Sequence, residues 1–398
     1  MSSANPLRRP YNSGASASSQ REELPRSSEL PRKDTSTTEL RSVRRPFVSF
    51  LTTAYQTEDY LTAMIDSVLA QTSADWELVI VDNGLSDAVA HVVDSYRHDP
   101  RIRFVRQQNR GYRGGVMAAA AVALGRYVCV LDSDDMVMPG FVATIAGFIE
   151  HHPEVDAVGC DAVHYDESHL VHLPTGHLDS LGVRWQPRFA REKLTMTDLL
   201  SGVIPYYTGA VRREAWEAVG GYAKVDLDVD DSEMPLYADH VTDVQMWIRL
   251  VQSYDVRLID ARLGWCRIRR ESLSRDKAKV EAFEVALITT LSRAAESAGL
   301  PADGEATNPL IRRVRFHQEL RRARGALLDG DILGARLHAR QAYSLQPGVR
   351  AAVVLASLAV SPTALRRLHP YKQHATTWWR RVREHRVRGS EQNATWSP

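Results

Sequence analysis

The sequence predicts an α/β protein with a mostly parallel, doubly wound sheet, followed by an α-helical extension. Between residues 47 and 131, short apolar and β-branched runs alternate with amphipathic helical patterns. The connections between successive runs are long enough for helical crossovers, which favours parallel strand pairs. After about residue 280 the apolar residues recur only at helical spacing, so we expect the last part of the chain to be α-helical.

The first strand–helix unit begins at residue 47. Phe47–Thr53 has strand character and ends at Ala54-Tyr55-Gln56. We expect Thr57 to be the N-cap of the helix that follows, because Glu58 and Asp59 then lie in its first turn. The apolar positions of this helix recur at helical spacing: Leu61, Ile65, Val68 and Leu69.

Two further units follow. A strand over Trp76–Val81 is stopped by Asp82-Asn83-Gly84, and a helix is expected over residues 87–96. A third, short strand covers Ile102–Val105. The segment 109–115 is a predicted Gly-rich loop, which leads into an Ala-rich helix that ends near Leu124 with Gly125 at its C′ position.

The fourth strand carries the strongest functional signal. Tyr127–Leu131 reads as a strand buried on both faces, and it stops at Asp132-Ser133-Asp134-Asp135. Three carboxylates at the end of a buried strand are costly unless positive charge lies beside them. A divalent cation that carries a phosphorylated ligand is the natural partner, since hard cations prefer oxygen ligands. An acidic turn that caps the next helix is the simpler alternative.

Two common nucleotide-binding motifs are missing from the sequence. No GxGxxG follows the first strand and no GxxxxGK[ST] occurs in the chain, which disfavours a dinucleotide dehydrogenase and a P-loop enzyme. Asp82, at the end of the second strand, is placed to accept hydrogen bonds from a base or a ribose. A helix-capping or turn role for Asp82 is the alternative, because Asp-Asn-Gly also favours a turn.

The composition indicates a soluble globular protein with an uneven charge distribution. Residues 1–45 hold nine Arg and Lys against five Asp and Glu, and residues 311–390 hold seventeen against four, although the formal charge of the whole chain is only +1. The middle is therefore acidic and suits a bound cation, whereas the basic C-terminal part suits an anionic surface. The three scattered cysteines have no zinc or CxxC spacing, which fits a reducing cytoplasm.

Four blocks, in order over residues 47–139, resemble the GT-A glycosyltransferases of family 2. Val48–Gln56 resembles the opening VSVIIPTYN, and residues 60–72 resemble YL…SVLxQT. Val79–Gly84 resembles IIVDDGS, and Leu131–Asp135 with Pro139 resembles LDxDD…P, which contains the DxD motif.

Three more blocks extend the resemblance to about residue 275. Residues 212–222 resemble a segment that ends in GGF, Thr242–Leu250 resembles EDxDLWLRL, and residues 265–274 resemble the closing yRxHxxSxS. The resemblance implies a GT-A domain over residues 46–279. A disordered segment (1–45) is expected before it, and a helical, basic extension (280–390) and a short tail (391–398) after it.

The family resemblance implies transfer of a sugar, with inversion, from a nucleotide-diphospho-sugar to an acceptor hydroxyl. Asp132 and Asp134 would form the DxD pair that binds Mg²⁺ or Mn²⁺, and Asp243 would be the catalytic base. The expected nucleotide-sugar-binding residues are Thr53, Ala54, Tyr55, Asp82, Gly111, Arg113 and Asp132. One base without a protein nucleophile suits a single displacement.

Two departures from the family pattern concern the Gly-rich loop and the ED pair. In the loop usually written NxGxSxARNxG, Gly115-Val116-Met117 stands where Ala-Arg-Asn is expected. Arg113 is either a substitute for the lost positive charge or a solvent-facing loop residue. The Glu of the ED pair is replaced by Thr242, and the nearest alternatives to Asp243 as the base are Asp239 and His240.

These patterns lead to an expected role in polysaccharide, cell-envelope or glycoconjugate synthesis. The acceptor would be a glycan, a lipid-linked glycan or a protein, and no nucleic-acid partner is expected. We expect a cytoplasmic protein whose basic C-terminal part can contact the inner face of the membrane, for which Trp378-Trp379 would supply interfacial rings. A nucleotidyltransferase and a catalytically inactive nucleotide-sugar-binding module are the alternative functions.

Overall fold

The computed structural model describes residues 45–167, 171–223, 241–269, 277–300, 308–363 and 366. Several sequence predictions lie outside these residues. They are the segment before residue 45, the alternative bases Asp239 and His240, the Ser272–Ser274 part of the closing block, and the Trp pair at 378–379.

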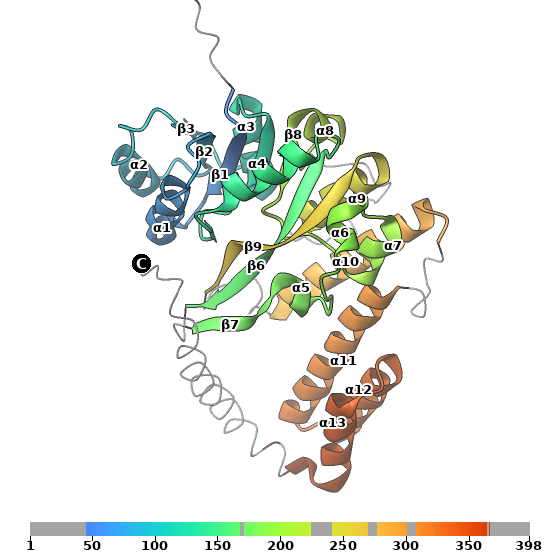
Figure 1. Cartoon of the computed structure of the whole chain (residues 1–398). Helices are drawn as coiled ribbons and strands as arrows, with labels where there is room; N and C mark the ends of the chain where they lie inside the picture. The colour runs from blue at the N-terminus through green and yellow to red at the C-terminus, as the bar shows by residue number, and fades with distance from the viewer. Residues whose placement is uncertain are drawn as a thin grey trace, which may run out of the picture. The chain divides into compact units, whose positions relative to one another are not determined.

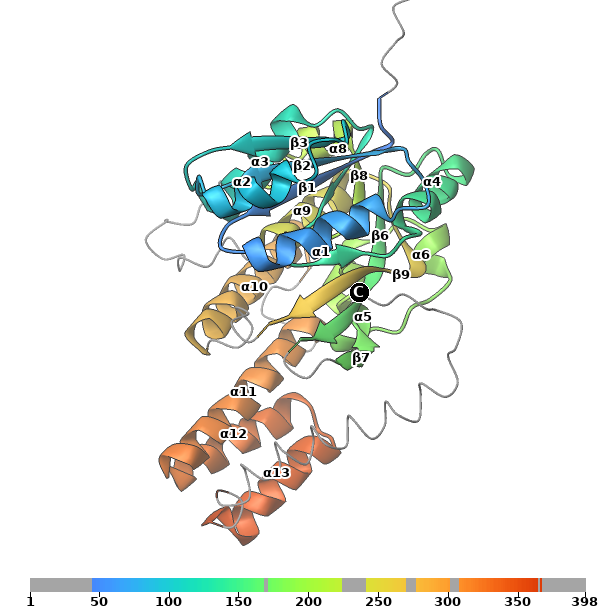
Figure 2. The same ribbon diagram turned by 90° about the vertical axis from the view of Figure 1, so that its left-hand side faces the viewer.

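The strand–helix alternation predicted for the first half is confirmed. In chain order its elements are β1 (Val48–Ala54), α1 (Glu58–Leu69), β2 (Trp76–Asp82), α2 (Asp87–Asp94), β3 (Ile102–Arg106), α3 (Gly111–Val122) and β4 (Tyr127–Val130). The strands are parallel neighbours in the order β3-β2-β1-β4. This order is that of a doubly wound sheet, and helices lie on both of its sides (Figures 1 and 2).

Two hydrophobic cores cover the faces of this sheet. Successive residues of β4 alternate between them, with Val128 and Val130 in one core and Tyr127 and Cys129 in the other. α1, α2 and α4 (Phe141–His151) contribute to the second core, and α3 contributes to the first. β1, β2 and β4 are therefore buried on both faces, whereas the edge strand β3 is only partly buried.

The second half of the sheet is mixed. Its strands are β5 (Met136–Val137), β6 (Ala157–Asp166), β7 (Val171–Gly176), β8 (Ala210–Arg212) and β9 (Val256–Ile268). β8 lies antiparallel between β4 and β6, and β6 pairs with β9 in parallel. β5 pairs antiparallel with β9, and β7 with β6. Among the described residues the strands thus form one nine-stranded sheet, parallel in its first half and mixed beyond β4.

Short helices surround the second half of the sheet. They are α5 (His177–Ser180), α6 (Arg188–Arg191), α7 (Met196–Ser201), α8 (Arg213–Ala218) and α9 (Thr242–Ser253). α9 is largely buried and belongs to the same core as α3, through Val244, Met246 and Trp247. Its first turn carries Asp243.

The C-terminal part is helical, as predicted, and it packs on the sheet domain. Its helices are α10 (Lys277–Ser297), α11 (Pro309–Asp329), α12 (Ile332–Leu345) and α13 (Val349–Val360). Leu287, Leu291 and Leu310 extend the core that also contains α7 and α9. α12 and α13 pack on the distal part of α11. In the described part of the chain, every helix is too short or too polar to cross a membrane.

Thr57 is the N-cap residue of α1, as predicted, with Glu58 and Asp59 in the first turn, although its hydroxyl contacts Ser133 Oγ at 2.7 Å and does not bond to the helix. Two local predictions are wrong. The expected Gly-rich loop at 111–115 is instead the first turn of α3. Gly125 is not the C′ residue of that helix, which ends at Val122; a Cβ there would lie 2.6 Å from Ser49 N, so the glycine permits close backbone packing against β1.

Candidate active site

The predicted site residues lie at the carboxyl ends of parallel strands. The register pairs Ala54 at the end of β1 with Asp82 at the end of β2. β4 runs parallel to β1 on its other side, and Asp132 follows shortly after β4 ends. The three strand ends therefore meet at one edge of the sheet, which is where ligands bind in open α/β folds.

Asp135 connects three parts of the chain beneath this edge. Its Oδ2 accepts hydrogen bonds from Tyr206 Oη and Tyr207 Oη, both at 2.7 Å, and its Oδ1 accepts one from Arg267 N at 2.8 Å. The carboxylate thereby joins the end of β4 to the segment before β8 and to β9. We infer that Asp135 positions the acidic segment, because its oxygens are already engaged.

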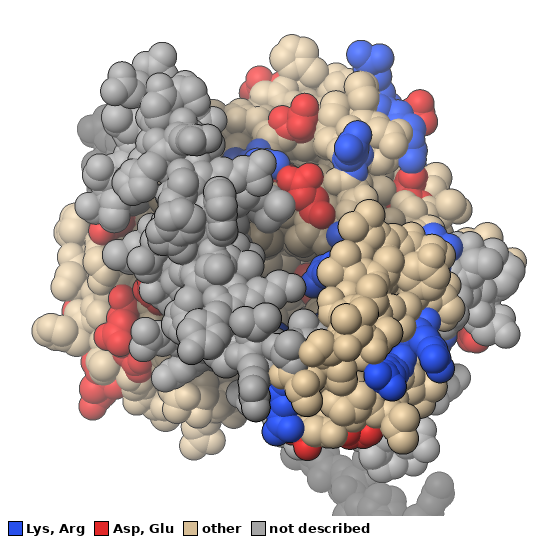
Figure 3. All heavy atoms as spheres, turned by 90° about the horizontal axis from the view of Figure 1, so that it is seen from below, with Lys and Arg blue, Asp and Glu red and all other residues tan. Residues whose placement is uncertain are grey.

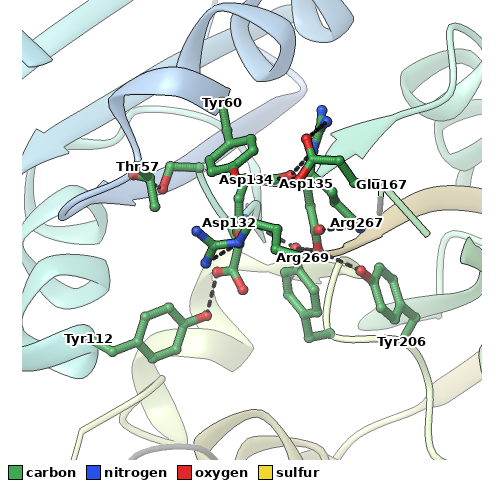
Figure 4. A network of polar contacts seen from close by, with 12 residues as sticks. Thr57, Tyr60, Tyr112, Asp132, Asp134, Asp135, Glu167, Tyr206, Arg267 and Arg269 are labelled. Atoms are coloured by element: carbon green, nitrogen blue, oxygen red, sulfur yellow. Dashed lines mark hydrogen bonds and ion pairs between the residues drawn. The ribbon is translucent and has the colours of Figure 1, made fainter. Parts of the chain in front are cut away.

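Asp132 and Asp134 project toward different partners, as Figure 4 shows. Asp132 Oδ1 accepts a hydrogen bond from Tyr112 Oη at 2.8 Å, and Asp132 N donates to Tyr207 Oη at 3.2 Å. Asp134 Oδ2 forms an ion pair with Arg269 at 2.7 Å. Side chains from α3, the segment before β8 and the end of β9 thus converge on the acidic segment (Figure 4).

Burial makes the charged forms of two of these acids costly. It raises the pKa of Asp132 well above its usual range, with Asp134 and Asp135 adding like-charge repulsion. Burial and the charge of Asp134 raise the pKa of Asp135 to about 7. The site therefore favours an added positive charge.

Asp243 reaches the same region from α9. Burial raises the pKa of Asp243 to about 6, and the neighbouring backbone N–H groups partly oppose this shift. The charge of Asp243 also raises the pKa of Asp132, Tyr112 and Tyr222. Asp243 and Asp132 therefore lie close enough to interact electrostatically.

The carboxylate of Asp82 is already occupied by contacts within the protein. It is buried, its Oδ2 accepts a hydrogen bond from Arg106 Nε at 2.9 Å, and its Oδ1 accepts one from Ser86 N at 3.0 Å. These contacts match the turn and capping alternative, and its contact with a nucleobase stays a prediction. The next residue, Asn83, organises the start of α3 through hydrogen bonds to Gln107 Nε2, Arg110 N and Gly111 O.

The other expected nucleotide-binding residues vary in exposure. Ala54 is buried beside Asp82, whereas Tyr55 is 49% exposed and lies against Gly84. Gly111 opens α3 with a φ of 73°. Arg113 is half-buried, and its charge contributes to lowering the pKa of Arg249. A contact between these residues and a donor stays a prediction.

Residues 49–220 match the family model described as glycosyl transferase family 2. This chain contains a family 2 glycosyltransferase domain. The match covers β1 to α8, and therefore both the acidic segment and Asp82. With the sheet order described above, it confirms the GT-A fold class expected from the sequence.

Curated relatives of the domain are similar over part of their length. The chain is 29% identical over 199 residues to a chondroitin synthase of Escherichia coli, covering 50% of this chain and 27% of that protein. It is 31% identical over 189 residues to a hyaluronan synthase of Pasteurella multocida, covering 47% of this chain and 18% of that protein. The chain thus spans less than a third of these relatives.

A likeness to solved structures was also found. S. aureus TarS 1–349 in complex with UDP-GlcNAc is 16% identical, with a TM-score of 0.49, covering 87% of this chain and 93% of that one.

The structure explains the Gly115 departure of this family 2 domain. A Cβ at Gly115 would overlap Thr53 Oγ1 and lie 2.7 Å from Thr53 Cβ. Thr53 stands where the opening block VSVIIPTYN has Pro. The departures at Thr53 and at Gly115 therefore lie next to each other in space. The Ala of the usual pattern does not fit beside this threonine, and Gly115 is required for the packing of α3 on β1.

We expect Gly115→Ala to lower the free energy of unfolding by about 1–3 kcal/mol, because it overpacks the α3–β1 contact. Gly147→Ala is the matched control. Gly147 lies within α4, and a methyl group at this position would have nothing within 4 Å, so the same change there should stabilise the protein by roughly 0.5–1 kcal/mol. Denaturant titration of both variants measures the difference, and equal stabilities would refute the packing explanation.

Sequence reasoning missed several residues of this family 2 site. Tyr112, Tyr206, Tyr207 and Arg267 hold the acidic segment, and Arg269 neutralises Asp134. A signal existed for the two arginines, since both fall in the closing yRxHxxSxS block. The tyrosines gave no signal, because their role depends on contacts between distant segments.

The chemistry of the acidic segment fits a hard divalent cation. Carboxylate oxygens are ligands that Mg²⁺ and Mn²⁺ prefer, and the position already accommodates the positive charge of Arg269 beside Asp134. Within the described residues no set of three or more His, Cys, Asp or Glu side chains forms a complete metal site. Phosphate oxygens and water would therefore have to supply the remaining ligands, as is usual for Mg²⁺.

Proposed function

We propose that the chain transfers a sugar from a nucleotide-diphospho-sugar to an acceptor hydroxyl with inversion at the anomeric carbon. The observation that carries this proposal is the position of Asp132 and Asp134 after β4, at the ligand-binding edge of the sheet, with the charge of Asp243 acting on Asp132. The family 2 match over residues 49–220 supports the same reaction class.

In this proposal, different residues act on the attacking hydroxyl and on the leaving group. Asp243 accepts the proton of the acceptor hydroxyl as that oxygen attacks, which is general base catalysis. Asp132 and Asp134 would hold Mg²⁺ or Mn²⁺, and the bound ion would supply positive charge beside the nucleoside diphosphate leaving group. Thr53, Ala54, Tyr55, Asp82, Gly111 and Arg113 line the nucleotide side in this proposal.

The class of product is proposed from the curated relatives. Their names describe synthases of chondroitin and hyaluronan, which are polysaccharides. We therefore propose that this chain acts in polysaccharide or cell-envelope glycan synthesis, with a glycan or a lipid-linked glycan as the acceptor.

The C-terminal helices are proposed to contact an anionic membrane surface. α12 and α13 expose apolar side chains at Leu333, Leu337, Val349, Val353 and Val360. Exposed arginines lie on α11 to α13: Arg312, Arg321, Arg322, Arg324, Arg340 and Arg350. Uncharged surface bordered by Lys and Arg is visible in the view from below (Figure 3). This combination suits peripheral binding to anionic lipid, and the cytoplasmic location stays a prediction.

The pH dependence of turnover tests the role of Asp243. A base works as the carboxylate, and burial raises the pKa of Asp243 to about 6. We therefore expect kcat/KM to be level above about pH 7 and to fall about tenfold per pH unit below pH 6. Asp132, whose pKa is raised by burial, and Asp135, with a pKa of about 7, are other acids nearby. The residual activity of Asp243→Asn should lose the inflection near pH 6 and so distinguish Asp243 from both.

A donor panel tests the proposed reaction class. Thermal shift with UDP- and GDP-sugars, with and without Mn²⁺, should identify a donor that stabilises the protein by mass action. Release of nucleoside diphosphate from that donor in the presence of Mn²⁺ is the expected result. Release of pyrophosphate would indicate a nucleotidyltransferase, and tight donor binding without turnover would indicate an inactive binding module.

A further inference from the structure

Arg269 binds the carboxylate that the proposed function assigns to a metal ion. It follows the last residue of β9 and forms its ion pair with Asp134 Oδ2 at 2.7 Å. The guanidinium also lies over the ring of Tyr60, 4.9 Å from the ring centroid. About one fifth of each charged side chain is exposed, 22% for Arg269 and 20% for Asp134. The pair is therefore shielded, yet open to an incoming ligand.

The neighbouring Arg267 is held in a different way. Its Nε donates to the backbone carbonyl of Asp134 at 3.0 Å, and it pairs with Glu167 at 3.2 Å. Its backbone N–H donates to Asp135. Arg267 thus belongs to the wall of the site and leaves the Asp134 carboxylate to Arg269. Figure 4 shows both arginines next to the acidic segment.

The residue type at position 269 differs from the family pattern. In yRxHxxSxS the arginine corresponds to Arg267, and the histidine two positions later corresponds to Arg269. A guanidinium stays charged at any accessible pH and has no lone pair with which to bind a metal. The positive charge of Arg269 beside Asp134 Oδ2 therefore opposes the approach of a divalent cation to this carboxylate.

We propose that Arg269 is the resident counter-ion of Asp134, that it competes with a divalent cation for this carboxylate, and that it moves to the donor diphosphate when the cation binds. The inference rests on the proposed function. Arginine binds phosphate oxygens as well as carboxylates, often through two parallel hydrogen bonds. A donor diphosphate therefore gives Arg269 a second anion to pair with. Because Arg269 then leaves Asp134, the bound diphosphate raises the affinity for the cation, and the bound cation raises the affinity for the diphosphate.

This coupling is reciprocal. If a nucleoside diphosphate raises the affinity for Mn²⁺ by some factor, Mn²⁺ raises the affinity for the diphosphate by the same factor. Removing the charge of Arg269 should tighten binding of Mn²⁺ alone and weaken the coupling. The expected gain is about tenfold, the scale for one positive charge facing a divalent ion about 5 Å away in a water-like dielectric.

Titration of Mn²⁺ into the full chain, followed by the electron paramagnetic resonance signal of free Mn²⁺, tests the proposal. The variants are Arg269→Gln and Arg269→Met, which both remove the charge, and Arg269→Lys, which keeps it. Arg97→Gln is the matched control, because it removes a positive charge from an exposed surface pair with Asp94. We expect tighter binding of Mn²⁺ alone in the first two variants and wild-type affinity in Arg269→Lys and Arg97→Gln.

Two outcomes would overturn the proposal. One is an affinity for Mn²⁺ in the charge-removing variants that equals or falls below that of the wild type. The other is a gain that persists when Asp134→Asn is added to Arg269→Gln, since the ion would then bind elsewhere. Neither outcome of the Mn²⁺ titration depends on turnover. Failure of the donor panel would therefore refute the proposed function, whereas failure of the Mn²⁺ titration would refute the role of Arg269.

Discussion

Asp243→Asn is expected to lower kcat by about 10²- to 10⁴-fold, the usual contribution of a general base, while donor affinity stays at the wild-type value. The amide keeps the size of the carboxylate but cannot accept the proton of the acceptor hydroxyl. Asp243 lies in the first turn of a largely buried helix, so its position is fixed by the α9 packing. We therefore expect the change to remove the proton acceptor and to leave the donor-binding contacts in place.

Steady-state kinetics with the donor found in the panel, and titration calorimetry for donor affinity, measure the two effects. Asp260→Asn, on an exposed position of β9, is the matched control and should leave both values unchanged. An Asp243→Asn variant with normal turnover would refute the assignment. Equal losses of donor affinity and turnover would indicate that Asp243 binds the donor and does not act as the base.

Asp134→Asn is expected to abolish metal-dependent donor binding. Asp134 pairs with the cationic Arg269, whereas Asp132 accepts a hydrogen bond from Tyr112 and has a pKa raised by burial. Loss of this ligand removes the charge that holds the divalent ion against the donor diphosphate. We expect the difference in donor affinity with and without Mn²⁺ to vanish in this variant.

Calorimetric titration of the donor, with and without Mn²⁺, measures this difference, with Asp260→Asn again as the control for charge. Retention of a wild-type Mn²⁺ effect in Asp134→Asn would contradict the metal assignment. The affinity for the donor in the absence of Mn²⁺ should survive the Asp134→Asn change, because Arg269 is then released from its ion pair and can reach the diphosphate.

The first half of the fold could be predicted because each signal there is local. β1, β2 and β4 are rich in apolar and β-branched residues, and each ends at or shortly before a turn or an acid. The error at Gly125 comes from its close contact with Ser49, which lies far away in the sequence. Local capping patterns do not contain that information.

The second half of the sheet and much of the site depend on non-local pairing. β6 and β9 pair in parallel through a register with irregularities, although about a hundred residues separate them. That pairing brings Arg267 and Arg269 to the acidic segment, and the loop before β8 brings Tyr206 and Tyr207. The sequence predicted the acids from their position after a strand, but it could not predict which side chains would surround them.

The anomeric configuration of the product tests the central claim most directly. The chain, its donor, Mn²⁺ and an acceptor oligosaccharide would be incubated, and the new glycosidic linkage examined by proton NMR. We predict a linkage of opposite anomeric configuration to the donor sugar, formed with release of one nucleoside diphosphate. A product that retains the donor configuration would contradict the single displacement with Asp243 as base.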